Sequence, residues 1–201
     1  MLLKTLIRKN RSYRRFHEKH KISKKTLISL VDLARLSGSS ANLQPLKYYL
    51  SSAAETNDEI FPCLKWAGYL KDWAGPSKGE RPSAYIIMMG DTKISRSFGY
   101  DAGIASQSIL LGAVEKALAG CIIGSIEREK LKSNLKIADH LEILLIIALG
   151  KPKEKVLIKP LRKSKSIKYW RDKKGSHYVP KRDLEEIIVN PLNSRQLKLL
   201  P

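Results

Sequence analysis

The chain has 201 residues, enough for one well-buried domain and too few for two ordinary domains joined by a linker. Hydrophobic residues make up 43% of it and charged residues 28%, a balance that excludes an intrinsically disordered protein. The longest strongly apolar run, residues 143–149, is far too short to span a membrane, and the first residues lack the apolar core and cleavage site of a signal peptide. We therefore expect a cytoplasmic protein.

Lysine and arginine outnumber aspartate and glutamate by 38 to 19, which gives a net charge of +19. The basic residues concentrate at 4–25 and 151–174. Neither stretch contains a zinc finger, an RNP-like strand or a basic helix that runs into heptads. Charge alone specifies no partner, so the favoured interpretation is that a basic chain binds an anionic cofactor or simply stays soluble, and a nucleic-acid-binding module is the alternative.

The two cysteines, Cys63 and Cys121, lie in apolar surroundings without CxxC spacing, and we expect both to be buried free thiols. The four histidines form no HExxH or similar ligand pair. The sequence therefore predicts no metal site.

The clearest predicted helix begins after Ser23, a favourable N-cap residue, and ends near Gly38, which suits a C-terminal cap. Four apolar residues recur on one face of this helix and predict that the face packs on a core; they are Leu27, Leu30, Val31 and Ala34. Residues 46–50, directly after Pro45, form a short strand candidate.

Residues 62–82 contain two of the three tryptophans and several glycines and prolines. This composition predicts an ordered loop with a helical piece, of the long kind that can cover a pocket. A buried strand is predicted at 83–89 and a long helix at 101–119. Many residues of that helix are small, which lets another helix approach closely, so we expect it in the centre of the fold or at a subunit interface.

The remaining elements are a short strand at 121–123, a charged helix at 127–135 and the most apolar strand at 141–149. After residue 152 the chain becomes basic and irregular, with a final helix at 182–189. This order of helices and strands predicts an α+β fold in which helices flank a mixed sheet. The C-terminal stretch has no core of its own and must lie over the body or over a partner subunit.

Two polar segments could hold a ligand. In residues 10–16, NRSYRRF, arginine forks and a serine hydroxyl suit a phosphate, although composition alone favours an ordinary basic surface turn. In residues 37–45, SGSSANLQP, serine, asparagine and glutamine in a tight turn offer hydrogen bonds to a polar ligand edge. The alternative there is a loop that only ends the preceding helix.

Taken together, these segments resemble the FMN-dependent nitroreductase family. An RS-x-R-x-F segment about twenty-five residues before SS-x-N-x-QP looks like the family's paired N-terminal signature. Three further stretches keep the family's order: residues 101–107 with 118–124, residues 148–152 and residues 180–188. Four matches in order are more specific than any one of them. Asn10 departs from the family pattern where many members carry a basic residue, and Gly38 where many carry proline.

The resemblance implies a mainly antiparallel sheet, an intertwined homodimer and a site for FMN built from two chains. A single FMN-binding domain would cover residues 1–189, followed by a tail at 190–201. The resemblance also implies the cofactor-binding residues. Arg11 and Ser12 would bind the FMN phosphate or ribityl chain, and Arg14 would lie near the pyrimidine edge. Lys181 and Arg182 would close over the phosphate.

The resemblance places two further groups at the flavin. Ser39, Ser40 and Asn42 would reach the flavin that the other subunit mainly holds. The strand residues that would pass the flavin ring, with a backbone N–H near N5, are Cys121, Ile122, Ile123 and Gly124. The lid around residues 64–73 does not align well enough to assign contacts.

The implied activity is hydride transfer from NAD(P)H through flavin N5 to an electron-poor acceptor, a nitroaromatic or a quinone, by a ping-pong mechanism. The cofactor carries the chemistry, so no catalytic side chain is expected beyond Arg14, which would tune the flavin. A different reaction on the same fold, dehalogenation or flavin fragmentation, is the alternative.

Overall fold

The computed structural model describes residues 1–70, 72–161 and 166–190. The chain forms two compact units, Met1–Glu154 and Lys155–Pro201. The prediction of one domain over residues 1–189 stays a prediction, and all but the first residue of the predicted tail lies outside the described residues.

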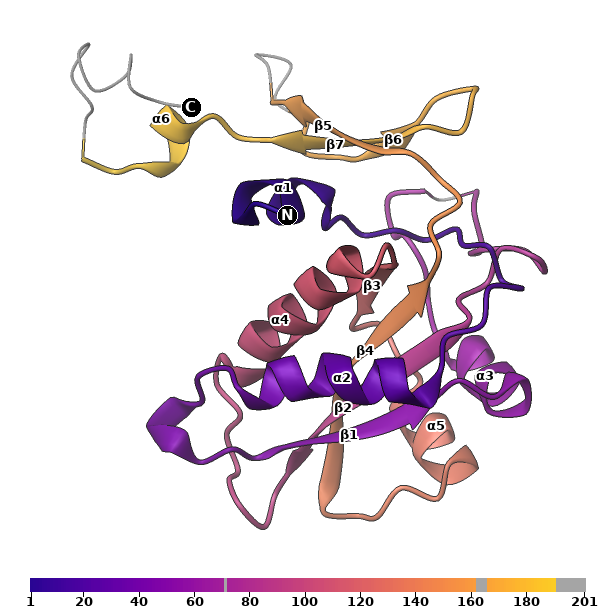
Figure 1. The fold of residues 1–201 in the computed structure, drawn as a ribbon, viewed down its shortest axis with the longest axis vertical. Helices are drawn as coiled ribbons and strands as arrows, with labels where there is room; N and C mark the ends of the chain where they lie inside the picture. Colours follow the sequence, from indigo (N-terminus) through magenta and orange to yellow (C-terminus); the bar gives the residue numbers. More distant parts are fainter. Residues whose placement is uncertain (71, 162–165, 191–201) are drawn as a thin grey trace. The chain divides into compact units, whose positions relative to one another are not determined.

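The first unit contains a four-stranded antiparallel sheet in the order β1-β2-β4-β3 (Figure 1). Its strands are β1 (Leu46–Ser51), β2 (Ala84–Asp91), β3 (Ala119–Ile123) and β4 (Leu141–Gly150). Every residue of the central strand β2 is buried. Its side chains alternate between two cores because successive residues of a strand point to opposite faces.

One core lies between the sheet and two helices, α2 (Lys24–Arg35) and α4 (Asp101–Glu115). On this side Ile86 and Met88 pack with Leu27, Leu30 and Ile109. Ser23 caps α2 as predicted, since its side chain accepts a hydrogen bond from the backbone N–H of Thr26 at 3.1 Å. The predicted extension of α4 to residue 119 is wrong.

The α4 helix ends at Glu115 because the chain turns back sharply into β3. Ala117 adopts a φ of 57°, and the backbone N–H of Leu118 donates to the carbonyl of Ala113 at 2.8 Å. The predicted strand is therefore two residues longer at its start, beginning at Ala119.

The opposite face of the sheet is covered by α3 (Ala54–Ile60), the 3-10 turn η2 (Phe61–Cys63) and α5 (Arg128–Asn134). Ile60, Cys63 and Leu131 pack there against Tyr85 and Ile87. Cys63 and Cys121 are both buried free thiols, as predicted. The arrangement of helices on both faces of an antiparallel sheet confirms the predicted α+β class.

An additional helix, α1 (Leu3–Lys9), precedes this body and was not predicted. Leu3, Leu6 and Ile7 recur on it at helical spacing, yet none of its residues is buried. Among the described residues, none of the helices has the length and hydropathy of a membrane-spanning segment.

The second unit contains a three-stranded mixed sheet in the order β5-β7-β6. It consists of β5 (Val156–Pro160), β6 (Trp170–Arg171) and β7 (His177–Lys181), with β5 parallel and β6 antiparallel to β7. The prediction of irregular structure here is wrong. The predicted final helix is reduced to one turn, α6 (Leu184–Ile187).

Candidate functional site

The N-terminal segment that follows α1 runs along the edge of the sheet at β3. Ser12 forms a parallel β-bridge with Gly120, and the backbone N–H of Tyr13 donates to the carbonyl of Gly120 at 3.0 Å. Packing inside the body requires a glycine here, because a Cβ at position 120 would lie 2.6 Å from a methyl of Leu110 and 2.8 Å from the carbonyl oxygen of Ala148. The bridge places Ser12 directly beside the strand that begins the predicted flavin-facing stretch.

Cys121 lies at the contact between the N-terminal segment and β3. Burial raises the pKa of its thiol, against the opposing effects of the nearby Arg14 charge and a hydrogen bond with Ser12. Beyond it, Ile123 is buried, whereas Ile122 and Gly124 are exposed. The structure therefore brings Arg14 and Ser12 together with the stretch Cys121–Gly124, and the open positions on that stretch are Ile122 and Gly124.

Arg11 is half-buried at the start of the same segment. Its Nη2 donates to the carbonyl of Ile7 at 2.8 Å, which ties it to the last turn of α1. Its Nε is buried and has no hydrogen-bond partner among the described residues. Burial also lowers the pKa of this guanidinium, although arginine remains charged at neutral pH. A buried N–H donor that lacks an acceptor costs free energy, and more so when it belongs to a charged group. The guanidinium of Arg11 is therefore suited to bind an anionic ligand.

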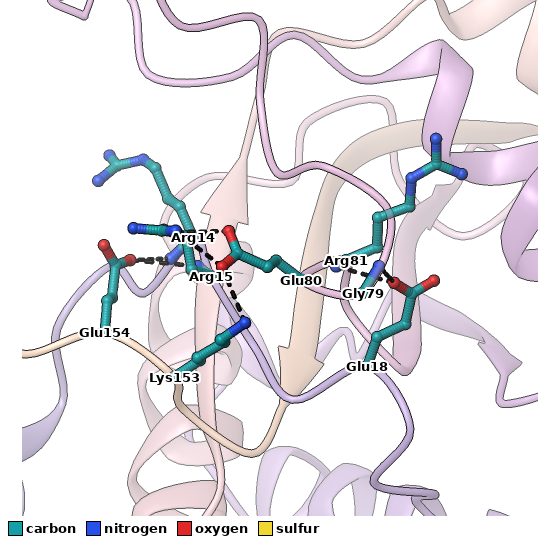
Figure 2. A network of polar contacts seen from close by, with 8 residues as sticks. All are labelled: Arg14, Arg15, Glu18, Gly79, Glu80, Arg81, Lys153 and Glu154. Atoms are coloured by element: carbon teal, nitrogen blue, oxygen red, sulfur yellow. Dashed lines mark hydrogen bonds and ion pairs between the residues drawn. The ribbon is translucent and has the colours of Figure 1, made fainter. Parts of the chain in front are cut away.

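A network of ion pairs holds the backbone of this segment in place. Figure 2 shows the side chains of Arg15 and Lys153 converging on the carboxylate of Glu80, at 2.5 Å and 3.0 Å. The hydrogen bond from Arg15, aided by Lys153, holds the pKa of Glu80 below its ordinary value against the opposing effect of burial. The carboxylate of Glu154 accepts hydrogen bonds from the backbone N–H groups of Arg14 at 2.5 Å and Arg15 at 3.2 Å. Arg14 is thus presented from a fixed backbone.

The loop before β2 is tied to the same segment. The carboxylate of Glu18 accepts hydrogen bonds from the backbone N–H groups of Gly79 and Arg81 (Figure 2). Phe16 is fully buried against Gly150 and its backbone N–H donates to the carbonyl of Glu80 at 2.9 Å. Residues 79–81, at the end of the predicted loop 62–82, are therefore anchored to the body.

The second predicted segment forms a turn stabilised by Asp101, the first residue of α4. Asp101 is 3% exposed and accepts hydrogen bonds from the Ser39 hydroxyl at 2.5 Å and the Ser40 backbone N–H at 2.9 Å. A carboxylate at a helix N-terminus is also favoured by the helix dipole. Asn42 and Gln44 adopt positive φ values, so the turn is tight and leaves Ser40 and Asn42 exposed. A cavity of about 230 Å³ opens beside it, lined by Ser39, Gln44 and Asp101 among others.

The two predicted segments lie apart within one chain (Figure 1). The turn at Ser39 sits at the first residue of α4, Asp101, whereas Gly120 packs against Leu110 in the third turn of that helix. At 1.5 Å per residue, these two points on the helix are separated by roughly 14 Å along its axis. The structure of one chain therefore does not bring Ser39, Ser40 and Asn42 together with Arg11.

The two C-terminal residues predicted at the site, Lys181 and Arg182, are exposed and belong to the second unit. The carbonyl of Lys181 accepts a hydrogen bond from the backbone N–H of Leu161 at 2.6 Å. Arg182 forms an ion pair with Glu186 at 2.9 Å. Both of these contacts lie within the second unit.

The family model of the nitroreductase family matches residues 7–151. This chain belongs to the nitroreductase family. The resemblance found in the sequence is thereby confirmed over the segment that contains the whole four-stranded sheet. A search among curated proteins finds no match.

Solved nitroreductase structures have the same fold. The chain is similar to a nitroreductase family protein from Clostridium novyi NT, with 24% identity, a TM-score of 0.63 and coverage of 76% of this chain and 86% of that one. It is also similar to an FMN-dependent nitroreductase from Clostridium difficile R20291, with 22% identity, a TM-score of 0.62 and coverage of 75% and 87%. A third similar structure, from Exiguobacterium sibiricum 255-15, is a complex with FMN, with 18% identity, a TM-score of 0.64 and coverage of 76% and 89%.

Sequence reasoning missed the acidic residues that organise the candidate site of this nitroreductase-family protein. Glu80, Asp101 and Glu154 were not singled out, although each fixes a predicted ligand segment. The scarcity of acidic residues could have drawn attention to them, because the chain has 19 acidic and 38 basic residues. An acidic side chain that is largely buried needs a specific partner. Sequence alone could not pair them, since Glu80 lies 65 residues from Arg15 and Glu154 lies 140 residues from Arg14.

Proposed function

We propose that this nitroreductase-family protein is an FMN-dependent oxidoreductase. The observation that carries the proposal is the buried, unpaired Nε of Arg11 within the described residues, next to Ser12 at the edge of β3. When bound, FMN supplies the redox chemistry, accepting hydride from NAD(P)H at N5 and passing it to a nitroaromatic or a quinone in a ping-pong sequence.

The residues along this edge fit the polar half of FMN. The half-buried guanidinium of Arg11 gives a charged donor for a phosphate oxygen, and the exposed Ser12 adds a hydroxyl donor. We propose Lys181 and Arg182 as further phosphate-binding residues. This assignment rests on their place in the family's sequence order and on their exposure.

The role of Arg14 is to hold positive charge at the pyrimidine edge of the ring. Its backbone N–H is fixed by Glu154, so the guanidinium starts from a defined position. A cation at this edge stabilises the negative charge that reduction places on the N1–C2=O group. The ring itself would lie along Cys121–Gly124, where Ile122 is 45% exposed and a Cβ on Gly124 would meet nothing within 4 Å.

We further propose that each site needs two copies of the chain. Within one chain, the turn of Ser39, Ser40 and Asn42 is held at the start of α4 by Asp101, whereas Asn10, the neighbour of Arg11, donates to Gln107 six residues further along that helix. A second copy in a homodimer would supply that turn to the flavin held by the first. The solved structure from Exiguobacterium sibiricum supports the cofactor, because that protein of the same fold is a complex with FMN.

The decisive experiment is a titration of the flavin-free protein with FMN, followed by reduction. Wild-type protein should bind FMN and oxidise NAD(P)H with a quinone acceptor. Arg11→Gln should weaken FMN binding about tenfold or more, because it removes a charge-assisted hydrogen bond to the phosphate. Arg14→Ala should weaken FMN binding or lower the midpoint potential of the bound flavin.

Arg96→Gln is the matched control, because Arg96 is exposed and lies outside both predicted segments. It should change neither the FMN affinity nor the potential. A wild-type protein that fails to bind FMN would overturn the proposed function. Equal FMN affinity of wild type and Arg11→Gln would remove Arg11 from the phosphate site.

A further inference from the structure

A second cavity in the first unit lies away from β3, at the end of the sheet where β1 stops and β2 begins. It encloses about 430 Å³, which lies within the range of small-molecule pockets. Its wall comes from the segment after Phe16, from the start of α3 and from the residues that lead into β2. None of the predicted flavin-binding residues lines it.

The cavity has a buried floor and an exposed rim. Pro82, Ser83 and Tyr85 are buried, while Arg81, Asn57 and Phe61 are partly buried. The rim residues are exposed, and they include Lys19, Lys21, Ser52, Ala53, Ala54, Glu55 and Asp58. This gradation from solvent to core is that of a ligand pocket rather than of a flat surface.

Ser83 is the unusual residue of the floor. It is 9% exposed, and its hydroxyl oxygen is buried without a hydrogen-bond partner among the described residues. Its backbone groups are both satisfied, because its N–H donates to the carbonyl of Leu149 at 3.0 Å and its carbonyl accepts from Asn57 Nδ2 at 3.0 Å. Only the hydroxyl is left over, and a buried hydroxyl without a partner costs free energy.

Arg81 supplies a second unpaired donor to the same cavity. Figure 2 shows its side chain extending away from Glu18, which binds only its backbone N–H. The guanidinium lies 4.2 Å from the centroid of the Phe61 ring, and its Nη1 is 3.6 Å from Asp58. Its Nε is buried and has no hydrogen-bond partner among the described residues. Stacking on a ring holds the planar fork in one orientation without using its donors.

The hydroxyl of Tyr85 also remains a donor. Tyr85 is 1% exposed, and burial raises the pKa of its phenol, so the group stays protonated at neutral pH. The floor and wall thus combine a guanidinium with two hydroxyl-bearing side chains. Phe61, Pro82 and the two alanines of the rim provide apolar surface beside them.

The geometry points to a site for a small carboxylic acid with an apolar body, bound by Arg81 and Ser83 at the start of β2. A carboxylate is planar and matches the arginine fork. The charged residues of the lining balance, because the acidic Glu18, Glu55 and Asp58 are matched by Lys19, Lys21 and Arg81, and this balance favours a singly charged carboxylate over a doubly charged phosphate. The apolar body would lie against Phe61 and Pro82.

The test uses cyclohexanecarboxylate, which is an apolar carboxylate without the flat ring that could stack on a flavin. Binding to the purified protein, with and without added FMN, is measured by titration calorimetry. Its neutral amide and inorganic phosphate serve as comparison ligands. The wild type should bind the carboxylate saturably, and should bind the amide and phosphate at least about tenfold more weakly, since each loses the charge or the shape that the site recognises.

Ser83→Ala should weaken binding of the carboxylate about tenfold, while its thermal melting temperature stays equal to that of the wild type or rises. The fold is expected to tolerate this change because the hydroxyl makes no hydrogen bond to the described residues. Arg81→Gln should weaken binding at least as much. The control is Ser52→Ala, an exposed serine on the rim of the same cavity, which should leave binding unchanged.

Three results would overturn the inference: no saturable binding of cyclohexanecarboxylate, equal affinity of the wild type and Ser83→Ala, or tighter binding of phosphate than of the carboxylate. Because none of these measurements depends on electron transfer, they are independent of the proposed oxidoreductase activity.

Discussion

The guanidinium of Arg15 donates two hydrogen bonds to the carboxylate of Glu80, from Nε to Oε2 at 2.5 Å and from Nη2 to Oε1 at 2.7 Å. This bidentate pair joins the N-terminal segment to the loop before β2. Lys153 reaches the same carboxylate from the end of β4, at 3.0 Å. The segment that carries Arg11 and Arg14 is therefore fixed from two sides, which matters for any ligand that these arginines bind.

The first prediction concerns the stability of this network. Glu80→Gln should lower the free energy of unfolding by about 1–3 kcal/mol, because the largely buried carboxylate at position 80 loses the charge that pairs with Arg15 and Lys153. The side chain of Glu80 is 12% exposed, whereas Asp32 and Arg35 form an ion pair at 52% and 64% exposure. Asp32→Asn is therefore the control and should cost less than about 0.5 kcal/mol. Urea unfolding measures the free energy of unfolding of both variants. Equal losses in the two variants would contradict the prediction.

The second prediction concerns pH. The pKa of Glu80 is held below its ordinary value of 4.5 by the hydrogen bond from Arg15. The unfolded chain therefore binds this proton more readily than the folded chain does. The stabilisation from Glu80 is fully present above pH 4.5 and is lost as the pH falls below that value towards the folded pKa. Urea midpoints of the wild type and Glu80→Gln, measured from neutral pH downwards, should converge in acid. A constant difference would contradict this.

The central part of the fold was predictable from the sequence because its pattern and its packing agree. Strand β2 is buried throughout and was predicted from an unbroken apolar run. Helix α2 was predicted from an apolar face and a serine cap, and both are present. Helix α3 was not predicted, because only Ile60 of its seven residues is buried. Apolar periodicity in a sequence reflects burial, so an element with few buried residues shows little of this periodicity.

The candidate site was predictable only in part, for a related reason. The arginines and serines of the two polar segments were found because ligand-binding residue types cluster locally in the chain. Their acidic partners were not found, because Glu80 and Asp101 lie 65 and 62 residues from Arg15 and Ser39. Such pairs are fixed by tertiary structure, so a single sequence carries no signal of which acid meets which base.

The third prediction concerns the contact that seats the N-terminal segment on β4. A Cβ at Gly150 would lie 2.7 Å from Cδ1 and 2.8 Å from Cβ and Cγ of Phe16, which is fully buried. Gly150→Ala should therefore displace Phe16 and destabilise the protein by about 1–3 kcal/mol. Gly38→Ala is the matched control, because a Cβ there meets nothing within 4 Å. It should be neutral or stabilise by up to about 1 kcal/mol. Equal melting temperatures of the two variants would show that the Phe16 contact does not determine the cost of Gly150→Ala.

The last prediction tests the proposed homodimer through helix α4. Ile104 lies on this helix and is 43% exposed, and a Cβ on the neighbouring Gly103 meets nothing within 4 Å. This open, apolar surface is where a second copy could approach closely, so Ile104→Glu should dissociate the dimer by burying an unpaired carboxylate. FMN affinity should fall with it, because each site would lose the turn at Ser39. Ile94→Glu, at 41% exposure in the turn after β2, should leave both properties unchanged. Sedimentation with and without FMN measures the two effects. An Ile104→Glu protein that remains dimeric and flavin-loaded would show that α4 does not form the interface.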